Sequence, residues 1–100
     1  MREELARTLG EVFWSDLRAH AGRDALIVVA AGLDLLEVGE ALAKNEAARV
    51  EAWIRAGQLG KPSAEELRLW PADPAARFES LIVSPFVLIR PLQRHLAPSN

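Results

Sequence analysis

The spacing of apolar residues changes several times along the chain, and each change marks a predicted element. In the first segment, the apolar residues that share one side are Leu5, Leu9 and then Val12 or Phe13. This helical period predicts a first helix over residues 2–10. A second short helix is predicted over 15–21, because it begins at a serine that can act as N-cap and a glycine follows it.

The period then changes from helical to continuous. Residues 25–30 (ALIVVA) are apolar and rich in branched side chains, which is typical of a strand buried on both faces. The runs 80–84 and 86–90 have the same character and are interrupted at Ser84-Pro85. Because proline cannot donate to a β-ladder, this point is predicted to lie at an edge or a bulge. A tight hairpin and one kinked strand are both compatible with it.

Two helices are predicted in the middle of the chain. Asp34 begins the first as its N-cap, and Glu37 follows three residues later, as in a capping box. Gly39 lies inside this helix, where glycine costs about 1 kcal/mol relative to alanine, so we expect another helix to approach closely there. A turn over 44–46 then leads to a second helix over 46–56.

Further helical signals precede the last two strands. Ser63 and Glu66 form a second capping-box pattern, which predicts a short helix ending near Trp70-Pro71. Asp73-Pro74 predicts one or two more helical turns, with proline at the first helical position.

The resulting order is helix, strand, helix, helix, extra helix, strand, strand. Without the extra helix, this is the order of a winged helix. The predicted fold is therefore α+β, winged-helix-like and helix-rich, with a small sheet of two or three strands over 25–30, 80–84 and 86–90. The alternative is a small α/β layer with helices on one side of three strands.

The two middle helices resemble the helix-turn-helix of MerR-type winged helices, on the apolar positions Val38, Leu42, Val50, Trp53 and Leu59. In such motifs the second helix enters the major groove of DNA. Under this alternative, the phosphate contacts are Lys44, Arg49, Arg55 and Lys61.

The charge of the chain disfavours that alternative. The second helix has two glutamates against two arginines, and the chain has 14 acidic and 12 basic residues, a net charge of −2. Affinity for DNA comes largely from neutralising phosphates, and this surface supplies little of it. The favoured interpretation is a scaffold for packing or for contacts with another protein, or with a second copy.

A metal site is the weaker of two interpretations for Asp16 and His20, which stand at i and i+4. No third ligand is placed by the sequence, and His95 lies far away near the C-terminus. A solvated helical pair is the favoured interpretation, so no metal or other cofactor is predicted.

Catalytic motifs are missing from the sequence. Asp34, Glu37 and Glu40 make an acidic edge, for which a helix cap and a solvated face are favoured over acid–base chemistry. No serine sits in a Gly-x-Ser-x-Gly elbow, and no glycine-rich phosphate loop occurs. The chain is therefore predicted not to be an enzyme. The remaining enzymatic hypothesis is an unrecognised site around Asp16, His20 and Asp34.

Six aromatic residues are candidates for a binding surface or for the core: Phe13, Trp14, Trp53, Trp70, Phe78 and Phe86. Tryptophan is enriched at interaction hot spots, but aromatic residues at helical spacing more often pack in a core. Trp53 is expected to be buried, and Trp14 or Trp70 partly exposed at helix ends.

The length and composition of the chain indicate a single domain of a cytoplasmic protein. One hundred residues make one domain, predicted over 1–91, with a flexible tail over 92–100. There is no cysteine, no signal-type apolar run and no apolar stretch of about 20 residues, so a cytoplasmic protein is expected. Apolar residues make up 50% of the chain without its 6 glycines, and with them the share exceeds the usual ~45–50% of globular chains. A buried face for self-association is compatible with this excess. The segment 81–89 is the predicted pairing edge of a homodimer.

Four segments in a fixed order carry a family resemblance: 33–38 (LDLLEV), 48–54 (ARVEAWI), 61–66 (KPSAEE) and 81–89 (LIVSPFVLI). Together they resemble the small bacterial proteins catalogued as domain of unknown function 2288. The resemblance covers roughly residues 5–90 and implies a stand-alone bacterial domain. It implies no activity, cofactor or site residue.

Overall fold

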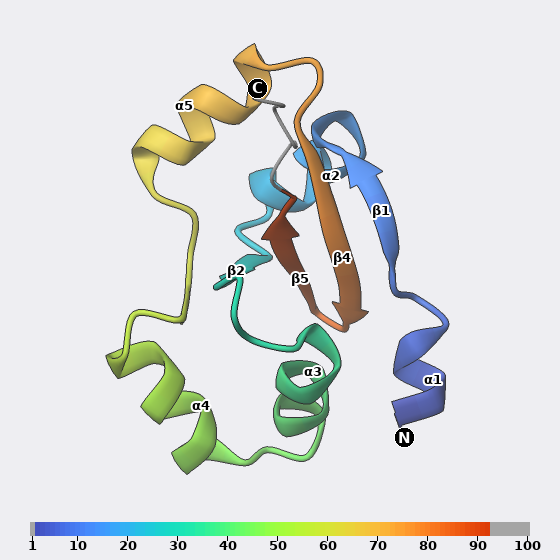
Figure 1. Cartoon of the computed structure of the whole chain (residues 1–100), viewed down its shortest axis with the longest axis vertical. Coiled ribbons are helices and arrows are strands. Elements are labelled where there is room, and N and C mark those ends of the chain that lie inside the picture. The colour runs from blue at the N-terminus through green and yellow to red at the C-terminus, as the bar shows by residue number, and fades with distance from the viewer. Residues whose placement is uncertain (1, 93–100) are drawn as a thin grey trace, which may run out of the picture.

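One mixed sheet organises the chain (Figure 1). The computed structural model describes residues 2–92. In chain order, its elements are α1 (Arg2–Ala6), β1 (Gly10–Phe13), α2 (Trp14–Gly22), β2 (Leu26–Val29), α3 (Leu35–Ala43), α4 (Ala47–Arg55), β3 (Leu59–Gly60), α5 (Ala64–Ala72), β4 (Arg77–Val83) and β5 (Phe86–Pro91). The strand order is β1-β4-β5-β2-β3. Neighbouring strands are antiparallel except β2 and β5, which are parallel.

The α+β class is confirmed, but the predicted size of the sheet is wrong. The three predicted strands correspond to β2, β4 and β5, while β1 and β3 complete a sheet of five. The winged-helix arrangement is not confirmed. The parallel β2–β5 pair also requires the long crossover through α3, α4, β3, α5 and β4.

Two apolar cores lie on the two faces of the sheet. The first contains Val29, Leu35, Val38, Leu59, Leu81, Val83 and Leu88 and is covered by α1, α3 and α4. The second contains Leu17, Leu26, Phe78, Val87 and Ile89 and is covered by α2 and α5. Successive side chains of a strand point to opposite faces, which is how β4 and β5 supply both cores. The alternative with helices on one side of three strands is therefore wrong.

The N-terminal helix is shorter than predicted, because the chain turns after Ala6 and begins β1 at Gly10. α1 ends at Ala6, and Val12 then pairs with Phe78 on β4. The Thr8 hydroxyl accepts a hydrogen bond from the backbone N–H of Ile82 at 3.1 Å, which aligns the chain with β4. Pairing with a distant strand thus overrides the local helical period, as tertiary context often does for branched and aromatic residues.

The predicted break at Ser84-Pro85 is a hairpin turn, with Val83 opposite Phe86 and a cis peptide bond before the proline. β2 flanks β5 at Val87, Leu88 and Ile89, whereas β1 flanks β4 only over residues 77–80. The prediction that 81–89 forms a pairing edge is therefore wrong for its β5 part, and for residues 81–83 it stays a prediction. The outer strands are β1 and β3, and the Asp16 carboxylate already accepts from the Phe13 N–H on β1, at 3.0 Å.

The middle helices agree with the sequence in most details. The Asp34 side chain caps α3 by accepting from the Leu36 N–H at 3.0 Å, and Asn45 takes the left-handed conformation between the helices, with φ of 57°. The expected close approach at Gly39 is confirmed: Leu5 of helix α1 would lie 3.6 Å from a Cβ there, and strand β4 comes closer still. A Cβ at this position would lie 2.6 Å from Leu81 Cδ2 on β4.

Three predictions at helix ends have different outcomes. The capping box of α5 is confirmed, since Ser63 Oγ accepts from the Glu66 N–H at 3.0 Å and a Glu66 oxygen accepts from the Ser63 N–H at 2.9 Å. The prediction that Ser15 caps α2 is wrong, because the helix begins at Trp14 and Asp16 supplies the cap. Asp73 begins a turn, not a helix, by accepting from the Ala75 N–H.

Within residues 2–92, no helix is long and apolar enough to cross a membrane. Of the predicted tail, Leu92 continues beside β4 by donating its N–H to the Arg77 carbonyl at 2.9 Å. Positions 93–100, including His95, lie outside the described residues.

Candidate binding groove

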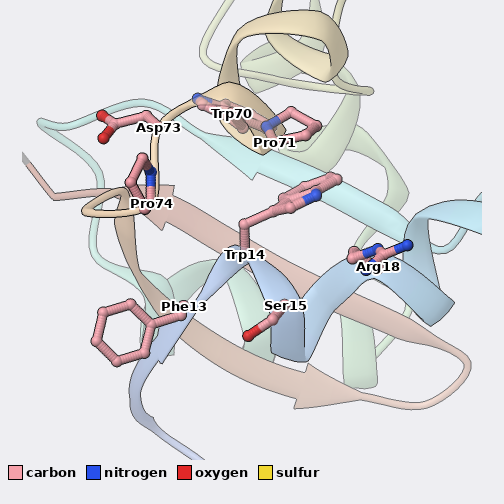
Figure 2. Close-up of a pocket in the computed structure, with 8 residues that line it drawn as sticks. All are labelled: Phe13, Trp14, Ser15, Arg18, Trp70, Pro71, Asp73 and Pro74. Atoms are coloured by element: carbon pink, nitrogen blue, oxygen red, sulfur yellow. The ribbon is translucent and has the colours of Figure 1, made fainter.

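An open groove of about 770 Å³ lies between the start of α2 and the end of α5 (Figure 2). Most of its lining consists of aromatic and proline rings. The lining residues are Phe13, Trp14, Ser15, Arg18, Trp70, Pro71, Asp73 and Pro74, and we call this site the aromatic groove.

The junctions of neighbouring elements place these side chains. β1 passes directly into α2, so Phe13 and Trp14 are consecutive and point to different sides (Figure 2). On the opposite side, α5 carries Trp70 and Pro71 in its last turn. Because helices rarely continue through proline, the chain turns here toward β4 and adds Asp73 and Pro74 to the rim.

Phe78 supports the two tryptophans from below. Its ring meets Trp70 edge to face at a centroid distance of 4.9 Å, and Trp14 at 6.2 Å. Trp14 and Trp70 lie 5.7 Å apart with a tilt of 47°. Edge-to-face and tilted arrangements are the favoured ones for aromatic pairs, so the packing fixes the orientation of both indoles.

The indole N–H groups of Trp14 and Trp70 make no hydrogen bond within residues 2–92. No buried side-chain nitrogen or oxygen of this part of the chain lacks a partner, so both N–H groups reach solvent. Two of the residues that line the groove therefore carry an indole N–H that can donate to a partner.

Opposite charges stand at different places on the rim. Arg18 makes no ion pair with any other residue in the described part of the chain, and Asp73 uses one carboxylate oxygen to accept from the Ala75 N–H. In Figure 2, Arg18 and Asp73 lie on opposite sides of Trp14.

A family model described as a protein of unknown function, DUF2288, matches residues 1–91. The chain belongs to this family. Its fold is similar to the NMR solution structure of PA1075 from Pseudomonas aeruginosa, with a TM-score of 0.78 and 31% identity over 93% of this chain and 85% of that one. No protein of curated function matches the chain. The family resemblance of the four sequence segments is thereby confirmed.

In this member of the family, the six aromatic residues divide into separate groups. Phe13, Trp14, Trp70 and Phe78 line or support the aromatic groove, whereas Phe86 lines a different hollow beside the β4–β5 turn. The expected partial exposure of Trp14 and Trp70 is confirmed. The expected burial of Trp53 is wrong, because this ring is half-buried and lies under the Arg49 guanidinium at 5.0 Å.

Each cation proposed for phosphate contacts has a carboxylate partner. The nearest nitrogen–oxygen distances are Lys44–Glu40 3.8 Å, Arg49–Glu37 2.5 Å, Arg49–Glu46 2.9 Å, Arg55–Glu51 3.5 Å and Lys61–Asp24 2.6 Å. The hydrogen bond with Glu46, with a smaller contribution from Glu37, raises the pKa of Arg49 above its ordinary value. These four cations are thus not free to meet phosphates without giving up a partner.

The proposed metal and acid–base residues have structural partners and do not converge. Asp16 caps the start of α2, whereas the His20 ring contacts Arg23 in the last turn of that helix. Asp34 caps α3, and Glu37 pairs with Arg49. Within residues 2–92, no three carboxylate or histidine side chains are grouped to hold a metal ion.

No motif in the sequence marks Ser15, Arg18, Asp73 or the two prolines as parts of one site. The one hint in the sequence is that Trp14 and Trp70 both stand near the end of a predicted helix. Their proximity depends on tertiary packing, which no local pattern contains.

Proposed function

We propose that this chain is a non-enzymatic protein-interaction domain that binds a segment of another protein in the aromatic groove. The observation that carries the proposal is the pair of solvent-accessible, unpartnered indole N–H groups in a ring-lined groove. Tryptophan side chains of this kind dominate binding energy at protein interfaces, because they combine a large apolar area with a hydrogen-bond donor.

The chemistry of the groove supports binding over catalysis. Arg18, Ser15 and Asp73 are the charged or hydroxyl-bearing side chains of its lining, and within residues 2–92 the Ser15 hydroxyl makes no hydrogen bond to a base. A nucleophile needs such a base to be activated. The cysteine-free sequence favours the cytoplasm as the compartment of this interaction domain.

Peptides selected from a random displayed library against the full chain are expected to bind in the aromatic groove. In a ¹H–¹⁵N spectrum, the indole signals of Trp14 and Trp70 should shift on binding, while that of Trp53 on α4 stays in place. Phe13→Ala should weaken the selected peptides at least about fivefold, because rim aromatic contacts of hot-spot quality are worth more than about 1 kcal/mol.

The matched control is Ile54→Ala. Ile54 is 52% exposed, close to the 48% of Phe13, and it lies on α4. This variant should leave the affinity unchanged. Selected peptides that shift only Trp53, or that bind Phe13→Ala as tightly as the parent chain, would contradict the proposed function.

Transcription regulation remains the alternative, because α3 and α4 do form two helices joined by a turn at 44–46. This alternative is disfavoured by the ion pairs of its four proposed phosphate contacts, because each cation would have to give up a carboxylate to bind DNA. The four are Lys44, Arg49, Arg55 and Lys61. In fluorescence anisotropy at low salt, we expect no micromolar binding of a random DNA duplex. Micromolar binding with a steep salt dependence would favour the regulator instead.

A homodimer is a further possibility within the same proposal, since the partner can be a second copy. The outer strands β1 and β3, and residues 81–83 of β4 beyond the end of β1, are the places for such a contact. Light scattering at high protein concentration tests it, and a strict monomer would remove the homodimer.

A further inference from the structure

We infer that the aromatic groove takes an extended, proline-containing peptide whose acidic residues lie against Arg18. The inference rests on the proposed function and adds the class of ligand and its direction. It depends on the shape of the lining, on the donors, on a neighbouring hollow and on the charges of the rim.

The lining is made of flat and rigid rings. Phe13, Trp14, Trp70, Pro71 and Pro74 account for most of it, and the groove lacks the long aliphatic side chains that line helix-binding grooves. Pyrrolidine rings of a ligand stack well on indole faces. Proline-rich segments in the polyproline II conformation are recognised in aromatic grooves of this kind.

The donors match the backbone of such a ligand. A polyproline II segment has no internal hydrogen bonds, so its carbonyl oxygens need donors from outside. The Trp14 and Trp70 indole N–H groups are unpartnered within residues 2–92 and reach solvent. Because their rings are held by Phe78, little side-chain freedom is lost when they donate.

A second hollow continues the groove. It has a volume of about 160 Å³ and shares Trp70 and Asp73 with the aromatic groove, while Phe78, Pro91 and Leu92 belong to its own lining. Trp70 thus stands between two neighbouring depressions. An extended peptide can place successive apolar side chains on both sides of this ring, whereas a compact small molecule would fill only one.

The charges of the rim give the peptide a direction. Arg18 has no ion-pair partner within residues 2–92, so an acidic residue of the ligand can pair with it without breaking an existing contact. On the other side, Asp73 and Arg77 both line the second hollow. Arg77 already pairs with Glu11, so Asp73 is the charge there that has no ion-pair partner within residues 2–92, and it repels acidic groups. The same carboxylate disfavours a single-stranded nucleic acid, which would bring phosphates along the whole path.

Two synthetic peptides test the pairing with Arg18, using the full chain at low salt: six prolines followed by two glutamates, and six prolines followed by two serines. We expect the glutamate peptide to bind about two- to fivefold more tightly, which is the range of an exposed ion pair. Both should shift the Trp14 and Trp70 indole signals. Arg18→Ala should remove the preference, and Arg18→Glu should reverse it.

Arg7→Glu is the matched control, because Arg7 on the turn after α1 also lacks an ion-pair partner within residues 2–92 and the change in net charge is the same. It should keep the preference for glutamate. A peptide with six alternating glycines and serines before the glutamates should leave both indole signals unmoved.

Three outcomes would overturn the inference: equal affinity of the peptides that end in glutamate and in serine, equal binding of the glycine–serine peptide, or displacement of the glutamate peptide by an octathymidine strand. The first two leave the proposed function standing if library-selected peptides still shift Trp14 and Trp70. Failure of the library peptides themselves would instead remove the proposed function.

Discussion

Replacing Phe78 by alanine is expected to lower the free energy of unfolding by about 3–5 kcal/mol, as for other buried aromatic residues. Phe78 is only 1% exposed, and it packs with Leu17, Leu26, Val87 and Ile89 in the core beneath α2 and α5. A domain of this size has a total stability of about 5–15 kcal/mol, so the loss is a large share of it. Urea unfolding followed by circular dichroism measures the change.

The same substitution should also disturb the aromatic groove, because Phe78 holds Trp14 and Trp70. We expect a loss of near-ultraviolet circular dichroism from the indole pair at denaturant concentrations where the chain is still folded. Ile82→Ala on the same strand is the control, since Ile82 is 46% exposed and its loss should cost less than about 1 kcal/mol. Equal destabilisation by both variants would contradict this account of the second core.

The parts of the fold that local chemistry determines could be predicted from the sequence. The caps at Asp34 and Ser63, the left-handed Asn45 and the buried strand β2 each depend on residues within one or two turns. β1 could not be predicted, because Val12 fits the helical period and becomes part of a strand only through its pairing with Phe78. The edge prediction failed for the β5 part of 81–89 for the same reason, since the flanking strand β2 comes from a distant part of the sequence.

The candidate site could be predicted only in part. The tryptophans indicated a possible binding surface, because this residue is enriched at interaction hot spots. The partial exposure of Trp14 and Trp70 at helix ends followed from the helical pattern. Their contact across 5.7 Å did not follow, because it requires α2 and α5 to lie on the same face of the sheet. Arg18 carries no local signal at all, and its role depends on which cations of the folded chain have found partners.

Gly39→Val is expected to destabilise the chain by about 3 kcal/mol, through overpacking where α3 crosses β4. A Cβ at Gly39 would lie 2.6 Å from Leu81 Cδ2 and 3.3 Å from Val83 Cγ2. Leu81 is fully buried, so it has little room to move away. Gly39→Ala should cost less, about 1–2 kcal/mol, because the better helix propensity of alanine offsets part of the clash.

Gly22→Ala on α2 separates the two effects, because a Cβ there would meet no atom within 4 Å. This control should be neutral or slightly stabilising in the same urea unfolding experiment. The clash also predicts a coupling: when Gly39→Val is combined with Leu81→Ala, the added methyl groups fill the space that leucine left, so the two losses should not add. Additive losses would mean that Gly39 and Leu81 do not meet, and the packing of α3 on β4 would then have to differ from the one described.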